Sequence, residues 1–135
     1  PDGNLELLME TNLYSAYYLS RYLLSALTAS AKANIFNVTS VAGIKAYPNG
    51  GSYSISKFAM LGLSKALREE LKSNSIAVTS LIPGATLTDS WAGSGLPEDR
   101  FMTVNDVADL VYNISCMSAQ TVVEEVVLRP MLGDI

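Results

Sequence analysis

The sequence contains no histidine and only one cysteine, Cys116. The absence of histidine excludes Ser-His-Asp and Cys-His nucleophilic sites, together with the common zinc sites that use histidine ligands. A single cysteine cannot form an internal disulfide or a cysteine metal cluster, so no metal site is expected. This cysteine usage predicts a reducing, cytoplasmic setting. Because Cys116 lies in an apolar, helical-looking stretch, we expect a buried structural thiol rather than a reactive one.

Long apolar runs and an excess of positive charge are also missing. No apolar run approaches the roughly 20 residues of a membrane-spanning helix, and residues 1–4 lack the positively charged start of a secretory signal. The formal net charge is −4, which disfavours a nucleic-acid partner. We therefore expect neither a membrane nor a nucleic acid as partner. With 49% hydrophobic and 16% charged residues, the chain can bury the core of one domain or part of one.

Helical and strand patterns alternate along the chain. Helices are predicted over 5–27, 52–71 and 104–117, and buried strands over 34–38, 76–82 and 122–128. Such alternation favours an α/β fold with a parallel sheet and helices on both of its faces. Asn4 is a candidate N-cap for the first helix, and Thr103 or Asn105 for the third.

Three parallel strands would leave unpaired apolar edges in the sheet. We therefore expect further strands upstream of Pro1, and the absence of an initiator methionine agrees with a piece of a longer or processed chain. The irregular segment 85–102 is unusually long for a loop, which is typical of binding loops and lids. Trp91 and Leu96 are its candidates to line a substrate pocket, and ordinary loop packing is the alternative for both.

Tyr53 and Lys57 are four residues apart in the second predicted helix, so their side chains share one face. A tyrosine has an ordinary pKa of ~10, and a nearby ammonium favours the phenolate. The pair could therefore act as a general acid or base near neutral pH. With seven tyrosines in the chain, the spacing alone is close to chance. A half-buried tyrosine beside a solvated lysine is the structural alternative.

Polar and turn residues at the ends of the predicted strands favour the catalytic interpretation of Tyr53 and Lys57 over the structural one. Ser40 follows the first strand and Pro83-Gly84 ends the second, so all three lie at the carboxyl edge, where open α/β sheets bind ligands. A turn serine and a plain strand terminator are the structural alternatives. Asn12 lies inside a long helix, where asparagine is not favoured, and a kink or a satisfied buried amide would also explain it.

Four segments in this order resemble the short-chain dehydrogenase/reductase family. They are Met9-Glu10-Thr11-Asn12-Leu13, Asn37-Val38-Thr39-Ser40-Val41-Ala42-Gly43, Tyr53-Ser54-Ile55-Ser56-Lys57 and Pro83-Gly84-Ala85-Thr86-Leu87-Thr88. The family has a helix with a catalytic asparagine, a strand ending in serine, a Tyr-x-x-x-Lys helix and a Pro-Gly-x-x-x-Thr loop. The resemblance covers about residues 5–128 and implies a Rossmann-like, doubly wound parallel sheet.

The resemblance also implies a catalytic set formed by Asn12, Ser40, Tyr53 and Lys57. Tyr53 would exchange a proton with the substrate oxygen, and Ser40 would position and polarise the substrate. Lys57 would hydrogen-bond the nicotinamide ribose and lower the pKa of Tyr53. Asn12 would hold a water that links Lys57 to solvent. Hydride would pass between the nicotinamide and the substrate carbon.

The implied cofactor is NAD or NADP. Its nicotinamide end would be lined by Pro83, Gly84, Thr86 and Thr88, besides Tyr53 and Lys57. The family's Gly-rich turn and the residues that select NAD or NADP belong upstream. The glycines at 50–51 and at 93 and 95 follow no strand into a helix and do not form a phosphate cradle.

Residues 1–135 are thus identified as the C-terminal part of a single NAD(P)-binding domain whose Gly-rich N-terminal half is absent. Alone, this part is expected to bind cofactor poorly and to be inactive. The implied activity is NAD(P)-dependent interconversion of a small-molecule carbonyl and an alcohol, as in 3-oxoacyl-carrier-protein reductases or related carbonyl reductases. The alternatives are a non-catalytic relative that binds or regulates, or an inactive fragment. A homodimer or homotetramer through helices 5–27 and 52–71 is expected.

Overall fold

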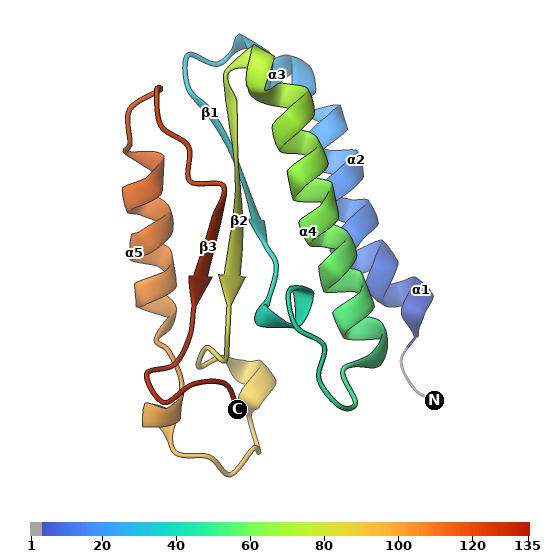
Figure 1. Cartoon of the computed structure of the whole chain (residues 1–135), viewed down its shortest axis with the longest axis vertical. Helices are drawn as coiled ribbons and strands as arrows, with labels where there is room; N and C mark the ends of the chain where they lie inside the picture. The colour runs from blue at the N-terminus through green and yellow to red at the C-terminus, as the bar shows by residue number, and fades with distance from the viewer. Residues whose placement is uncertain (1–3) are drawn as a thin grey trace.

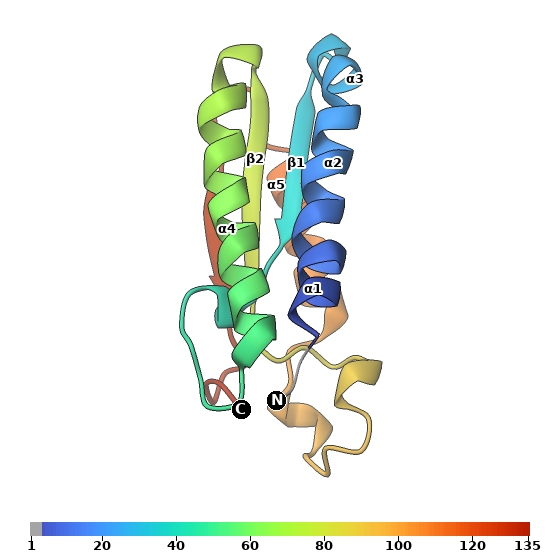
Figure 2. The ribbon, with the colours of Figure 1, turned by 90° about the vertical axis from the view of Figure 1, so that its right-hand side faces the viewer.

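The protein is described from a computed structural model, which places residues 4–135. Three parallel strands form one sheet in the order β1-β2-β3: β1 (Ala33–Val38), β2 (Ile76–Pro83) and β3 (Glu125–Leu128). The helices are α1 (Leu5–Leu8), α2 (Ser15–Tyr22), α3 (Leu24–Ala29), α4 (Gly51–Leu71) and α5 (Val104–Ser115). Helices α1 to α4 cover one face of the sheet and α5 covers the other (Figures 1 and 2). The predicted parallel α/β architecture is therefore confirmed.

The strand register brings the carboxyl ends of the strands to one edge of the sheet. Ala33 pairs with Ile76 and Val38 with Leu81, while Pro83 pairs with Leu128. All three arrowheads in Figure 1 point toward the same end of the molecule. The chain segments that leave the strands consequently meet there, as expected for a ligand-binding edge.

The first predicted helix follows one path from Leu5 to Ala29, but it is not a regular α-helix. Asn4 caps its start, since the side chain accepts a hydrogen bond from the Leu7 amide at 3.1 Å. Residues Met9–Tyr14 are π-helical, which inserts one wide turn between α1 and α2. Single π-helical turns occur frequently at functional sites. Asn12 lies within this turn.

The third helix ends at Ser115, two residues earlier than predicted. The Lys32 ammonium donates to the carbonyls of Ser115 and Met117 at this end of the helix. Cys116 is the C-cap and is exposed, so the expectation of a buried thiol was wrong. At the start of the helix, the Thr103 side chain accepts from the Asp106 amide at 3.2 Å and forms the predicted N-cap.

The last strand is also shorter than predicted, because β3 pairs only with the carboxyl half of β2. The core lies between β2 and α4, where Ile76 and Val78 pack with Leu67 and Leu71. Each of these four side chains is at most 6% exposed. None of the helices in residues 4–135 combines the length and the hydropathy needed to cross a membrane.

Candidate active site

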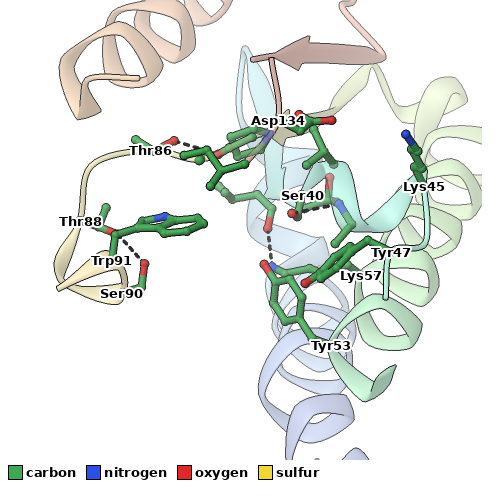
Figure 3. Close-up of a pocket in the computed structure, with 18 residues that line it drawn as sticks. Ser40, Lys45, Tyr47, Tyr53, Lys57, Thr86, Thr88, Ser90, Trp91 and Asp134 are labelled. Atoms are coloured by element: carbon green, nitrogen blue, oxygen red, sulfur yellow. Dashed lines mark hydrogen bonds between the residues drawn. The ribbon is translucent and has the colours of Figure 1, made fainter. Parts of the chain in front are cut away.

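A cleft of about 650 Å³ opens at the carboxyl edge of the sheet. Its walls come from the loop after β1, the first turns of α4, the loop after β2 and the C-terminal segment (Figure 3). The cleft is lined by seven of the residues that the sequence singled out: Ser40, Tyr53, Lys57, Pro83, Gly84, Thr86 and Thr88. Asn12 is not part of its lining.

Ser40 is held at the start of a 3₁₀ turn, Val41–Gly43, that follows β1. Its side-chain oxygen accepts a hydrogen bond from the Ala42 amide at 3.1 Å, so Ser40 is the N-cap of this turn. The neighbouring Thr39 is buried and donates its hydroxyl to the Leu81 carbonyl at 2.8 Å, which fastens the end of β1 to β2. Since the Ser40 oxygen accepts from the backbone, its own O–H can donate to a ligand in the cleft.

Lys57 lies deep in the same cleft and is 9% exposed. Its ammonium donates to the Val38 carbonyl at 3.1 Å, at the last residue of β1. Burial disfavours the charged form and lowers the pKa of Lys57 below its ordinary value. One of the three ammonium hydrogens is used by Val38, so two remain for a ligand.

Tyr53 lies one helical turn before Lys57 and is 37% exposed. The Lys57 nitrogen lies 5.7 Å from the centroid of the Tyr53 ring. Both side chains point into the cleft between Ser40 and the loop after β2 (Figure 3). The two side chains therefore lie on one face of α4, as their spacing predicts.

Gly43 brings the serine turn against α4. A Cβ added at Gly43 would lie 2.8 Å from the Lys57 carbonyl oxygen and 3.0 Å from its carbonyl carbon. Real Cβ atoms do not approach the backbone so closely, so only glycine permits this packing. The close approach sets the position of Ser40 relative to Tyr53 and Lys57.

Asn12 is connected to the helical turn of Tyr53 through Ser56. Its amide nitrogen donates to the Ser56 hydroxyl at 2.9 Å, and that hydroxyl donates to the Tyr53 carbonyl at 2.8 Å. Asn12 thus contacts the helix that carries Tyr53 and Lys57 without entering the cleft. Its role in holding a water for proton relay remains a prediction.

The loop after β2 forms the opposite wall. The Gly84 amide donates to the Leu128 carbonyl at 2.8 Å, and a Cβ at Gly84 would meet Pro130 at 3.1 Å. The Thr86 hydroxyl donates to the Gly84 carbonyl at 3.2 Å. The Thr88 hydroxyl shares a hydrogen bond of 2.7 Å with Ser90. These contacts order the segment that is expected to face the nicotinamide.

The long segment 85–102 is a closed, ordered loop. The Met102 amide donates to the Ala85 carbonyl at 3.0 Å, and the Leu87 amide donates to the Met102 carbonyl at 2.9 Å. Trp91 packs against Phe101 with ring centroids 5.1 Å apart and lines the cleft. Leu96 is not among the lining residues, so only one of the two pocket candidates lies at the cleft.

Four polar residues that the sequence interpretation missed also line the cleft: Lys45, Tyr47, Ser90 and Asp134. Tyr47 begins a Tyr-Pro-Asn-Gly turn between Ser40 and Tyr53, and this turn signal could have located it. Asp134 is fastened by an ion pair with Arg129. Its place depends on how the C-terminal segment folds back after β3, for which the sequence has no local signal.

The fold and this arrangement can be compared with known proteins. The sequence profile of the family described as short chain dehydrogenase matches residues 1–98. The chain belongs to the short-chain dehydrogenase family. The resemblance seen in the four sequence segments is therefore confirmed.

Individual members of the short-chain dehydrogenase family are similar over most of the chain. Sepiapterin reductase of Chlorobaculum tepidum is 34% identical over 131 residues, covering 94% of this chain and 52% of that protein. The 3-oxoacyl-[acyl-carrier-protein] reductase of Haemophilus influenzae is 32% identical over 114 residues, covering 77% of this chain and 47% of that protein. The chain spans about half the length of these curated relatives.

Solved structures agree with the fold. A β-ketoacyl-[ACP] reductase from Bacteroides thetaiotaomicron is 27% identical, with a TM-score of 0.79 over 96% of this chain and 53% of that chain. A 4-hydroxyisoleucine dehydrogenase in complex with NADH is 26% identical, with a TM-score of 0.80 over 96% of this chain and 60% of that chain. The expected Rossmann-like fold class is thus confirmed.

Proposed function

We propose that the whole protein to which these residues belong is an NAD(P)-dependent oxidoreductase that interconverts a carbonyl and an alcohol, as a 3-oxoacyl-carrier-protein reductase or a related carbonyl reductase does. Residues 1–135 would form the C-terminal part of its single NAD(P)-binding domain. The observation that carries the proposal is the meeting of Ser40, Tyr53 and Lys57 in one cleft at the carboxyl edge of the sheet. Membership of the short-chain dehydrogenase family supports it.

In this proposal, each side chain has a role that its contacts permit. The Ser40 hydroxyl donates to the substrate oxygen and polarises the carbonyl. Tyr53 gives its phenolic proton to the same oxygen as the alcohol forms, and takes it back in the reverse direction. Lys57, held by the Val38 carbonyl, keeps a positive charge beside the Tyr53 ring. Asn12 supports the helical turn of Tyr53 through Ser56 and would hold the relay water.

The donor set of the cleft fits the nicotinamide end of a dinucleotide. Lys57 has two ammonium hydrogens left for ribose hydroxyls, and the wall formed by Pro83 and Gly84 carries the hydroxyls of Thr86 and Thr88. When bound, the nicotinamide supplies or accepts the hydride. The similar 4-hydroxyisoleucine dehydrogenase in complex with NADH supports this cofactor class.

A cradle for the cofactor's pyrophosphate is a separate requirement. Within residues 4–135, none of the glycine pairs connects a strand to a helix in the manner of a dinucleotide-binding turn. We therefore expect a polypeptide of residues 1–135 alone to bind nicotinamide cofactors weakly and to show little turnover.

The alternative is a non-catalytic relative that uses the fold for binding or regulation. The two hypotheses differ in one assay on the full-length protein, namely whether a ketone panel causes oxidation of NADH or NADPH. The proposed function predicts carbonyl-dependent loss of reduced cofactor with stoichiometric alcohol formation. Tight cofactor binding without any such turnover would instead favour the binding protein.

We also propose a homo-oligomeric assembly and a cytoplasmic location. Exposed apolar side chains lie on the first helical path and on α4, which supports a homodimer or homotetramer through helices 5–27 and 52–71. A cytoplasmic setting is supported by the single cysteine.

A further inference from the structure

Thr39 lies where the paths of β1 and β2 separate. Its amide donates to the Leu81 carbonyl at 2.8 Å, one residue beyond the last register pair of the two strands, Val38 with Leu81. After Thr39 the chain enters the 3₁₀ turn Val41–Gly43, whereas β2 continues to Pro83 beside β3. The cleft opens between these two paths.

The Thr39 hydroxyl adds a second hydrogen bond at the same place. It donates to the Leu81 carbonyl at 2.8 Å, so one oxygen accepts both the amide and the hydroxyl of a single residue. Thr39 belongs to the cleft lining but is only 3% exposed, so this bond lies beneath the cleft surface. Strand pairing does not require the hydroxyl, because the amide already satisfies the Leu81 carbonyl.

The residues on either side of Thr39 support two reactive side chains. The Val38 carbonyl, one residue earlier, accepts from the Lys57 ammonium at 3.1 Å (Figure 3). Ser40, one residue later, lines the cleft beside Lys57. A shift of the Thr39 backbone would therefore move the acceptor of Lys57 and the Ser40 hydroxyl together.

Leu81 belongs to the opposite wall of the cleft through β2. Three residues after Leu81, the Gly84 amide donates to the Leu128 carbonyl at 2.8 Å, which fixes the start of the loop after β2. This loop is the wall that is expected to face the nicotinamide. The separation between Ser40 and that wall is thus set across the contact of Thr39 with Leu81.

We propose that Thr39 is a positioning residue, whose hydroxyl bond to Leu81 holds Ser40 and the Val38 carbonyl at a fixed distance from the nicotinamide wall. In this role Thr39 acts through Ser40 and Lys57, without contact with the substrate. Placement of this kind matters for the rate, since a displacement of about 1 Å can lower turnover by roughly 10²-fold. The inference rests on the proposed function, because it takes the substrate to lie between Ser40 and that wall.

Three substitutions in the full-length protein separate the hydroxyl from the rest of the side chain. Thr39→Val keeps the branched shape and Thr39→Ala removes bulk, and both lose the hydroxyl, whereas Thr39→Ser keeps it. All three leave the amide bond to the Leu81 carbonyl in place, so folding should be preserved. Thr79→Val is the matched control, at a threonine of β2 that is 1% exposed and is not part of the cleft lining.

The kinetic test measures ketone reduction. Thr39→Val and Thr39→Ala should lower kcat about tenfold or more and change the KM for the ketone less, because orientation is lost rather than affinity. Thr39→Ser should retain most of the activity, and Thr79→Val should retain all of it. Full activity in both hydroxyl-free variants would overturn the inference. Equal losses in Thr39→Ser and Thr39→Val, or a comparable loss in Thr79→Val, would overturn it as well.

Amide hydrogen exchange tests the positioning without any turnover. The Gly43 amide donates to the Ser40 carbonyl at 2.8 Å and reports opening of the serine turn, while the Val78 amide reports the core. Relative to Val78, Gly43 should exchange about three- to tenfold faster in Thr39→Val and Thr39→Ala, the loss of one neutral hydrogen bond, and unchanged in Thr39→Ser.

The two measurements distinguish this inference from the proposed function. Absence of turnover in the unsubstituted full-length protein would refute the proposed function, while the faster exchange of Gly43 would still show that the Thr39 hydroxyl holds the serine turn. An unchanged ratio of Gly43 to Val78 exchange in both hydroxyl-free variants would refute the role of Thr39, whatever the turnover.

Discussion

Lys57 illustrates, at the residue scale, how the fold alters a side chain whose position the sequence indicates. The four-residue spacing places Lys57 beside Tyr53, and the helix confirms that geometry. The spacing does not show that the ammonium is buried against the Val38 carbonyl, because that contact depends on where β1 ends relative to α4. Burial then lowers the pKa of Lys57.

This lowered pKa predicts a pH dependence of stability. Between the folded pKa of Lys57 and its ordinary value, the unfolded chain holds the proton more tightly than the folded chain. The free energy of unfolding should therefore rise with pH across this interval, and the rise should disappear in Lys57→Met. Urea unfolding of the full-length proteins at a series of alkaline pH values measures it.

Lys65→Met is the matched control, since the Lys65 side chain on the same helix is 63% exposed. Its alkaline slope should match that of the unsubstituted protein. If Lys57→Met also kept that slope, burial of the Lys57 charge would not be the source of the pH dependence.

Other residues show where sequence reasoning succeeds and fails. Ser40 and Tyr53 come together because strand ends and helix faces follow from local patterns. Cys116 was misplaced because an apolar pattern does not show where α5 ends. Tyr47 was missed because a turn signal locates a bend without showing what its side chains face.

At the element scale, the site depends on how closely the turn after β1 packs on α4. Sequence periodicity predicted β1 and α4, but it could not predict the contact of Gly43 with the Lys57 backbone. Sequence periodicity also could not predict the π-helical turn at Met9–Tyr14, because the pattern of apolar residues there fits an ordinary helix. Packing distances and helix irregularities arise from tertiary contacts, which a local pattern does not contain.

The packing of Gly43 can be tested with an alanine. Gly43→Ala should destabilise the full-length protein by about 1–3 kcal/mol, the usual range for overpacking, and should lower turnover by separating Ser40 from Tyr53. Denaturant unfolding and kcat/KM measure the two effects.

Gly62→Ala, at a position inside α4, has the opposite expectation. A Cβ at Gly62 meets no atom within 4 Å, so alanine should stabilise the helix by up to about 1 kcal/mol without loss of activity. If Gly43→Ala and Gly62→Ala changed the free energy of unfolding alike, the close approach of Gly43 to the Lys57 backbone would not affect stability.

At the scale of the whole molecule, the described residues leave aromatic side chains exposed on α2 and on α4. Tyr18 is 66% and Tyr22 86% exposed, and Phe58 on α4 is 46% exposed. The rings of Tyr14 and Tyr18 lie 6.5 Å apart. Exposed aromatic groups of this kind are typical of protein interfaces.

These exposed aromatic side chains predict that charge will disrupt the proposed assembly. The full-length protein should be a dimer or tetramer, and Tyr18→Glu together with Phe58→Glu should reduce its mass in solution, because two charges would be buried. Light scattering after gel filtration measures the mass. Val104→Glu, at an exposed valine on α5, should leave it unchanged. A monomeric unsubstituted protein, or an unaltered mass in the double variant, would show that these helices are not the interface.

The most direct test of the proposed active site is the phenol of Tyr53. In the full-length protein, Tyr53→Phe should lower kcat/KM for ketone reduction by roughly 10²-fold or more, the contribution of a general acid. Tyr112→Phe should retain full activity, because that side chain is 69% exposed on α5. Turnover by Tyr53→Phe within a few-fold of the unsubstituted protein would contradict the assignment of proton transfer to this cleft.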